Sequence, residues 1–230
     1  MPLRGKGVLA IWHAMTAEGD REMIRWHDRE HVAERVGVPG FLRGRRYAHA
    51  TEPRRYLDFY ETESVETIRS QPYLDRLNEP TPWTSRVLPH FRDTLRIGCR
   101  VLASAGRGQG GAMLTLRLRQ AAGREAALRG WLTGAALGQL AEPTGVVGVH
   151  VLETMPETTS IRTAEGKLKG GEVGEAEVVP PFVLVVELSD AAAAEPLLAG
   201  PLGGAALAGR GGAPEGVAGL YRLQLTMDRE

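Results

Sequence analysis

The sequence has one cysteine, no surplus of charge and no long apolar run. Cys99 is the only cysteine among 230 residues, which excludes an internal disulfide and a zinc site built from cysteines. Lys plus Arg and Asp plus Glu both number 28, so the formal net charge is zero. Because binding to phosphates relies on surplus cations, this balance argues against a nucleic-acid partner. No apolar stretch approaches the length of a membrane span, so we expect no membrane partner either.

The N-terminal residues lead directly into an apolar strand pattern, and no signal peptide is expected there. The hydrophobic fraction of 43% is ample for a packed core. We therefore expect a soluble cytoplasmic protein.

The sequence repeats one pattern of elements, in the order strand, helix, strand, strand, helix, strand. Trp26 and Trp131 occupy matching positions in the first helix of each copy. The order is that of the ferredoxin-like unit. Hydrophobic periodicity, caps and turn residues predict strands over 8–14, 41–50, 56–61, 94–103, 113–118, 146–153, 182–188 and 217–227, and helices over 20–36, 65–77, 124–140 and 191–208.

These boundaries predict an α+β chain of two domains. Residues 1–104 form a first ferredoxin-like unit, 105–111 a glycine-rich linker, and 112–230 a second, degenerate unit. The second unit contains a polar loop over 156–181, a length typical of lids, binding loops or disorder. A ferredoxin-like sheet has helices on one face only, so we expect the two sheets to cover each other as an intramolecular α+β barrel. Duplication replaces a dimer contact, so a monomer and a homodimer are both compatible with the sequence.

The first helix of the first copy carries the polar groups, whereas its counterpart over 130–136 has no ionisable side chain. On a helical wheel, Glu30 falls between Met23 and Trp26, on the apparent inner stripe. A carboxylate there is expensive unless it is paired or faces a cavity, which favours a polar pocket. The alternative is that Val32 and Val36 form the buried edge and the glutamates are solvated.

The same helix matches H-x-x-E-H through His27, Glu30 and His31, the signature of inverted zinc peptidases. Two histidines one turn apart could bind a metal, with Glu34 as a third ligand. No distal acidic ligand can be identified, so two ordinary helix histidines are the favoured interpretation and no cofactor is expected.

The neighbouring strands add basic and aromatic side chains. Arg45 and Tyr47 share one face of the second strand and Arg46 lies on the other, while Tyr60 belongs to the third strand. Arginine binds carboxylates in a fork, so these residues could anchor an anionic or phenolic ligand. A solvated or salt-bridged face is the alternative. Trp83, in a proline-rich loop, could close over a pocket or plug the fold. Ordinary structural roles are expected for three further histidines, His13, His90 and His150.

The stretch from Trp26 to Tyr47 resembles the dimeric α+β barrel superfamily, most of all the branch related to the ethyl tert-butyl ether degradation protein D. The shared features are an aromatic residue, a Glu30-His31 pair, the Pro39-Gly40 turn and a basic, aromatic strand. The resemblance covers about residues 7–103 and implies the fold and a pocket between helices and sheet. Relatives include polyketide cyclases, lactone isomerases, cofactor-independent oxygenases, decarboxylases and proteins without known activity, so the fold does not select a reaction. Haem-binding relatives would place their histidine in the second unit, where only His150 is available.

We therefore predict a small-molecule enzyme of the lyase or isomerase type. His31 would act as general acid or base, because its unperturbed pKa lies near working pH, and Glu30 or Glu34 would orient it. The substrate would be a mostly apolar cyclic or aromatic compound with an acidic group, and proton transfer would lead to isomerisation, cyclisation, elimination or decarboxylation. Alternatives are a binding or accessory protein for a hydrophobic metabolite, and a metal-dependent enzyme at the helix. The residues expected to bind substrate are Trp26, His27, Arg45, Arg46, Tyr47, Tyr60 and Trp83.

Overall fold

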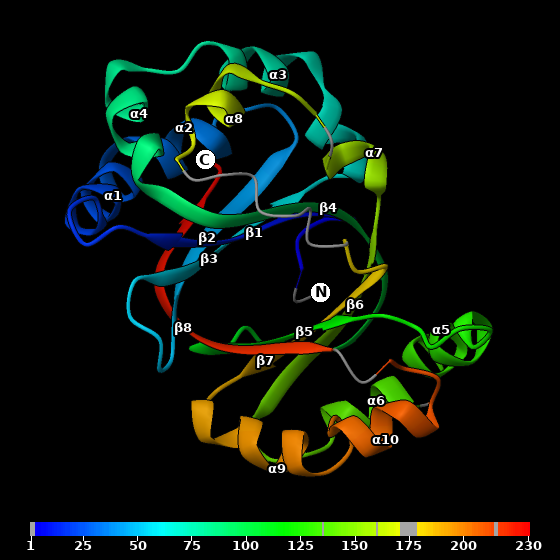
Figure 1. Ribbon diagram of the computed structural model, residues 1–230. Helices are drawn as coiled ribbons and strands as arrows, with labels where there is room; N and C mark the ends of the chain where they lie inside the picture. The colour runs from blue at the N-terminus through cyan, green and yellow to red at the C-terminus, as the bar shows by residue number, and fades with distance from the viewer. Residues whose placement is uncertain (1–2, 135, 160, 171–178, 214–215) are drawn as a thin grey trace. The chain divides into compact units, whose positions relative to one another are not determined.

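The structure is a computed structural model that describes residues 3–134, 136–159, 161–170, 179–213 and 216–230. Within this part of the chain the residues form two compact units (Figure 1). The N-terminal unit comprises residues 3–100, the described residues of 155–179, and 223–230, and the C-terminal unit comprises 101–154 and the described residues of 180–222. Two segments that lie within the expected second unit 112–230, the described residues of 155–179 and residues 223–230, therefore belong to the N-terminal unit.

The N-terminal unit is an antiparallel sheet in the order β4-β1-β3-β2-β8, with helices packed on one face (Figure 1). Its strands β4 and β8 continue into the other unit, and only Phe91 to Arg100 and Leu223 to Asp228 belong here. Its elements are β1 (Gly7–Met15), α1 (Asp20–Trp26), η1 (His27–His31), α2 (Val32–Val36), β2 (Phe41–His49), β3 (Arg55–Thr62), η2 (Val65–Arg69), α3 (Gln71–Asn78), α4 (Pro82–Val87), η3 (Leu88–His90), β4 (Phe91–Gly106), α7 (Pro156–Thr159), α8 (Ala164–Leu168) and β8 (Val217–Asp228).

The C-terminal unit has the sheet order β4-β6-β7-β5-β8. Its core is aliphatic, with Leu114, Val151 and Leu184 fully buried. His150 is buried on the opposite face of β6 from Val151, and its Nδ1 lies 3.0 Å from the hydroxyl of Ser104. The elements particular to this unit are β5 (Ala112–Leu118), α5 (Glu125–Thr133), α6 (Ala136–Ala141), β6 (Val146–Thr154), β7 (Phe182–Leu188), η4 (Ala191–Ala193), α9 (Ala194–Ala199) and α10 (Gly204–Gly209).

The predicted mixed α+β architecture and order of elements are present, and several boundaries differ. β4 extends to Gly106, so the first two residues of the expected linker 105–111 belong to a strand. The expected loop over 156–181 contains α7 and α8, while 160 and 171–178 lie outside the described residues. The predicted loop around Trp83 is helical, because Thr81 caps α4 by accepting a hydrogen bond from Thr84 N and Pro82 tolerates the first turn.

The helix predicted over 20–36 is built from α1, η1 and α2, and its middle part η1 is π-helical. A π-helical turn is wider than an α-helical turn, so a wheel drawn at constant angle loses its phase there. Val32 and Val36 are consequently buried on the same helix as Met23 and Trp26, and Glu30 is only partly buried. Short π-helical turns occur frequently at functional sites.

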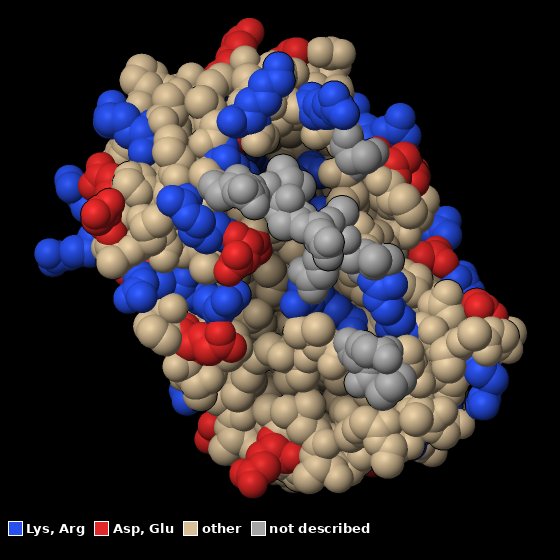
Figure 2. All heavy atoms as spheres, in the orientation of Figure 1, with Lys and Arg blue, Asp and Glu red and all other residues tan. Residues whose placement is uncertain are grey.

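The surface agrees with the neutral composition. On the face shown in Figure 2, basic and acidic side chains are both present and are scattered among side chains of other kinds. None of the helices in the described ranges has both the length and the apolar character needed to cross a membrane.

Candidate active site

Strand register places the polar residues of the N-terminal unit on the helix-covered face of its sheet. Ile11 on β1 pairs with Asp58 on β3 and with Arg96 on β4, and Asp58 pairs with Arg46 on β2. Directly paired residues point to the same face, so three charged side chains lie in one row across the sheet. Tyr60 is two residues from Asp58 and shares this face.

Asp58 is the buried carboxylate at the centre of this face. His13 Nε2 lies 3.1 Å from Asp58 Oδ2, and His27 Nδ1 lies 3.6 Å from Asp58 Oδ1. Burial alone would raise the pKa of the Asp58 carboxyl, but His27, His13 and Arg46 outweigh it and hold this pKa below its ordinary value. Asp58 therefore stays ionised and lies between two imidazoles.

Three rings lie against one another where η1 meets the sheet, the two imidazoles stacked and the indole tilted. The ring centroids of Trp26 and His31 are 3.9 Å apart, and the rings of His27 and His31 are 5.3 Å apart and nearly parallel, at 9°. His27 is 1% exposed and His31 is 8% exposed, so His31 is the more accessible of the two imidazoles.

Burial keeps this histidine pair neutral. Desolvation lowers the pKa of His27 to about 4, although Asp58 opposes the shift. Desolvation is also the largest cause that moves the pKa of His31 well below its ordinary value, with the Arg35 charge next. Both rings are therefore neutral imidazoles at pH 7, and neutral imidazoles can accept protons. Among the described residues, neither ring nitrogen of His27 and not Nδ1 of His31 has a hydrogen-bond partner.

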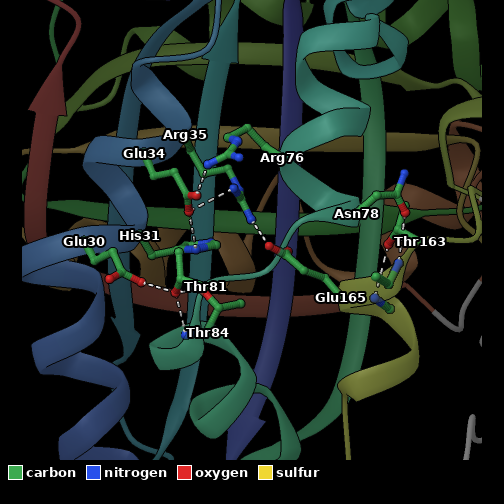
Figure 3. A network of polar contacts seen from close by, with 12 residues as sticks. Glu30, His31, Glu34, Arg35, Arg76, Asn78, Thr81, Thr84, Thr163 and Glu165 are labelled. Carbon is green, nitrogen blue, oxygen red and sulfur yellow. Dashed lines mark hydrogen bonds and ion pairs between the residues drawn. The ribbon is translucent and has the colours of Figure 1, made fainter.

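A network of ion pairs surrounds His31 (Figure 3). Glu34 Oε2 lies 3.9 Å from His31 Nδ1 and 3.2 Å from a guanidinium nitrogen of Arg35, while Glu34 Oε1 accepts a 2.9 Å hydrogen bond from Arg76. Arg35 also donates to Glu165 on α8. Arg35 is 2% exposed, so these two carboxylates compensate a buried charge.

Glu30 holds the tryptophan rather than a histidine. Its Oε1 accepts a 2.6 Å hydrogen bond from the Thr81 hydroxyl (Figure 3). The same oxygen accepts a 3.2 Å bond from the Trp26 indole, and Thr84 Oγ1 accepts a second, 3.3 Å bond from the indole. These bonds fix the ring that stacks on His31 and tie η1 to α4.

Only some of the predicted substrate-binding residues join this cluster. Trp26, His27 and Tyr60 lie in it. Arg46 shares the face but is occupied by hydrogen bonds to Asp28, Gln224 and the Ile24 carbonyl.

Arg45 and Tyr47 lie on the opposite face of the sheet from the histidine pair. Arg45 donates a 2.7 Å hydrogen bond to the Tyr47 hydroxyl, and its Nη2 lies 3.1 Å from Glu61. Trp83 is half-buried on α4 and donates to Glu22 at 2.9 Å, at the edge of the aromatic core. Neither position brings these three residues against His31.

The helix does not present a metal site. Within the described ranges, no group of three or more His, Cys, Asp or Glu side chains has the arrangement that could hold a metal ion. The near-parallel stack of His27 and His31 gives the reason, since nitrogen lone pairs lie in the ring planes and do not converge between stacked rings. The H-x-x-E-H spacing is therefore not sufficient for a metal site on this π-helical turn.

Sequence reasoning missed the partners that come from elsewhere in the chain. Asp58 was detectable, because a charged residue interrupts an otherwise apolar and aromatic strand. His13 was assigned a structural role, and its ring is in fact stacked on Phe91 at 4.4 Å and bonded to Asp58. Glu165 and Lys169 carried no signal, because only tertiary packing brings a distant polar segment back to the first repeat.

Comparison with known proteins relates the whole chain to solved structures. No protein-family model matches the sequence, and no curated protein matches it. An anthrone oxidase-like protein has 15% identity and a TM-score of 0.63, covering 100% of this chain and 96% of its own. A putative monooxygenase from Lactobacillus acidophilus has 10% identity and a TM-score of 0.58, covering 97% of both chains. A ferredoxin-fold protein from Listeria monocytogenes, described as related to antibiotic biosynthesis monooxygenases, has 9% identity and a TM-score of 0.51, covering 97% of both. The chain thus has the mixed α+β, ferredoxin-like fold of these structures.

Proposed function

We propose that the N-terminal unit is an enzyme active site in which a neutral histidine removes a proton from an apolar, cyclic or aromatic substrate. The observation that carries the proposal is the buried, stacked pair His27 and His31, both held neutral and both with a ring nitrogen that has no hydrogen-bond partner among the described residues. Buried polar groups are normally hydrogen-bonded, so unsatisfied ones suggest a function or a bound ligand.

His31 is the proposed base, since it is the more accessible ring. Its Nε2 would accept the substrate proton, and the electron pair of the broken C–H or O–H bond would remain on the substrate as an enolate or phenolate. A base with a lowered pKa is weak in the empty site. The negative charge that develops on the substrate raises the pKa of His31 during the transfer. The imidazolium and the substrate anion therefore form in the same step and stabilise each other.

Two neighbours would stabilise the imidazolium that results. Glu34 Oε2, 3.9 Å from Nδ1, places a carboxylate beside the new charge. The Trp26 ring, with its centroid 3.9 Å from that of His31, offers a π face to the cation. Glu30 would act indirectly by fixing Trp26. These roles assign Glu34 the orienting part and make Glu30 a positioning residue.

Proton removal is a first step shared by several reactions. Reprotonation at another atom gives isomerisation, and loss of a leaving group gives elimination. A second candidate is oxidation, in which the carbanion reacts with O2, and the names of the solved structures with this fold favour it. For anthrone, loss of the C10 proton and reaction with O2 would yield anthraquinone and water. For the fold, we also propose that the chain arose by tandem duplication and that its two ferredoxin-like units form an intramolecular α+β barrel.

Anthrone also provides the test. Under argon in D2O, the protein should accelerate exchange of the C10 hydrogens above the rate without protein, and His31→Gln should reduce the acceleration by about 100-fold or more. His49→Gln, at the end of β2, is the matched control and should retain full exchange. Admission of O2 then reports whether oxidation follows. Exchange that persists in His31→Gln would contradict the proposal, and tight binding without exchange would favour the accessory-protein alternative.

A further inference from the structure

Hydrogen-bond donors without acceptors gather on the face that carries the histidine pair. The hydroxyl of Tyr60 and Nη2 of Arg96 are buried and have no hydrogen-bond partner among the described residues. Arg96 uses its other terminal nitrogen to donate a 2.5 Å bond to the Thr158 carbonyl. Burial, followed by the Asp58 charge, moves the pKa of Tyr60 well above its ordinary value, so Tyr60 keeps its proton and remains a donor.

Register places these two donors on the same face of the sheet, on the two strands that flank β1. Arg96 stands in the row of Ile11 and Asp58, and Tyr60 stands in the next row, paired with Leu9. Leu9 in turn pairs with Gly98 on β4, where a Cβ would lie 2.1 Å from Thr158 Oγ1. The glycine therefore lets α7 approach the strand closely enough for its carbonyl to hold Arg96.

Lys169 supplies a third donor from the end of α8. Its Nζ lies 5.4 Å from the centre of the Phe91 ring, which stacks on His13. Hydrogen bonds hold residues 164–170 in place. Arg35 donates to Glu165, and Ala164 N donates to Asn78 Oδ1 at 3.1 Å. The backbone N of Gly170 also donates to the Leu88 carbonyl at 3.3 Å.

Acidic side chains compensate the cations near Lys169 to different extents. Arg35 has Glu34 and Glu165 as partners, whereas Arg96 is bound by a carbonyl oxygen. Burial lowers the pKa of Lys169 to about 8, and the Arg96 charge adds to this shift, so the two cations destabilise each other. An anion bound between them would remove this repulsion and accept the free hydrogen bonds.

We propose that Tyr60, Arg96 and Lys169 form an anion subsite that binds the carboxylate, enolate or phenolate oxygen of the substrate beside His31. This subsite rests on the proposed function. It differs from the anchor for an anionic ligand that the sequence predicted. Arg45 and Tyr47 lie on the opposite face, and Arg46 is occupied by Asp28 and Gln224. The required ligand is an apolar ring system with an acidic oxygen.

Binding of 2-naphthoate, measured by isothermal titration calorimetry, tests the subsite without requiring turnover. The naphthalene ring represents the apolar body of the ligand, and 2-naphthalenemethanol is the neutral probe of the same shape. Wild-type protein should bind 2-naphthoate more tightly than the alcohol. Lys169→Met should weaken 2-naphthoate by about 10-fold or more, the usual scale of a charged hydrogen bond, and should leave the alcohol within about twofold. Lys167→Met, an exposed lysine on the same helix, is the matched control.

The pH dependence separates a bound anion from a merely structural lysine. The groups that interact with Lys169 are Arg96 on β4, Asp58 on β3, Arg35 on α2, Glu165 on α8 and His31 on η1, whose pKa lies below 6.5. Its ammonium loses its proton as the pH rises through about 8, so affinity for 2-naphthoate should fall above that pH in wild type and stay flat in Lys169→Met.

Tyr60→Phe removes a hydroxyl that has no described partner, so it should keep or raise the melting temperature while weakening 2-naphthoate. Equal affinity of wild type for the acid and the alcohol, or no effect of Lys169→Met on the acid, would overturn the subsite. The two proposals are tested by different measurements. If His31→Gln loses proton exchange but binds 2-naphthoate as wild type does, His31 is supported as the base and the subsite is supported independently of it.

Discussion

Acidification should destabilise the protein through the buried histidines while Asp58 stays ionised. A histidine whose pKa is lower in the folded state binds its proton more readily when unfolded. The loss of stability therefore begins as the pH falls below the unfolded value of 6.5 and is complete below the folded value of about 4 for His27. Each pKa unit corresponds to about 1.4 kcal/mol, so the full effect of His27 is about 3 kcal/mol.

Most of this loss is accessible in a mild pH range. Integration between pH 7 and pH 5 gives about 2 kcal/mol for His27 alone. His31, whose pKa moves in the same direction, adds to it. Asp58 has a lowered pKa, so its stabilisation is lost only as the pH falls below the ordinary value of 3.8, outside this range. Glu34 has a raised pKa and acts in the opposite sense, since its folded form holds a proton more readily.

Urea denaturation followed by tryptophan fluorescence at pH 7 and pH 5 measures the difference. Wild type should lose about 2 kcal/mol or more on acidification, a midpoint shift of roughly 1 M urea. His27→Gln lacks the titrating group and should lose about 2 kcal/mol less than wild type over the same interval, with Glu34 unchanged in both. An equal loss in His27→Gln and wild type would refute the assignment of a neutral, buried His27.

Two further predictions concern the packing that positions the site. Glu165→Gln should lower the free energy of unfolding by about 1.5–3 kcal/mol, because it weakens the hydrogen bond from the buried Arg35. The control Glu157→Gln, at an exposed position, should change this free energy by less than about 0.5 kcal/mol. An unchanged denaturation midpoint in Glu165→Gln would contradict the pairing of Glu165 with Arg35. Gly98→Ala would place a Cβ 2.1 Å from Thr158 Oγ1, so it should destabilise by about 1–3 kcal/mol and expose α7 to limited proteolysis, and wild-type stability would show that the close approach is absent.

Local patterns predicted most elements of the fold, because strand alternation, caps and proline positions are local. The tryptophan, the two histidines and their helix could be identified from sequence for the same reason. The wheel misplaced Glu30 and the valine edge, since a π-helical turn depends on tertiary contacts that no local pattern encodes.

The anchors for an anion could not be predicted correctly. Arg45 and Arg46 are neighbours in sequence, but their side chains point to opposite faces because residues alternate along a strand. Arg45 forms an ion pair with the buried Glu61. Glu165 and Lys169 are far from the first repeat in sequence, and their polar surroundings resemble an ordinary loop. Only the folded chain shows that this segment returns to the histidine pair.

The protonation of the two imidazoles is the central claim, and nitrogen-15 NMR of histidine-labelled protein measures it directly. The account predicts that His27 and His31, assigned through His27→Gln and His31→Gln, remain neutral at pH 6 and that His27 titrates near pH 4. His49 provides an internal comparison at the end of β2. If His27 and His31 were protonated at pH 6, neither could serve as the neutral base, and the proposed function would be contradicted.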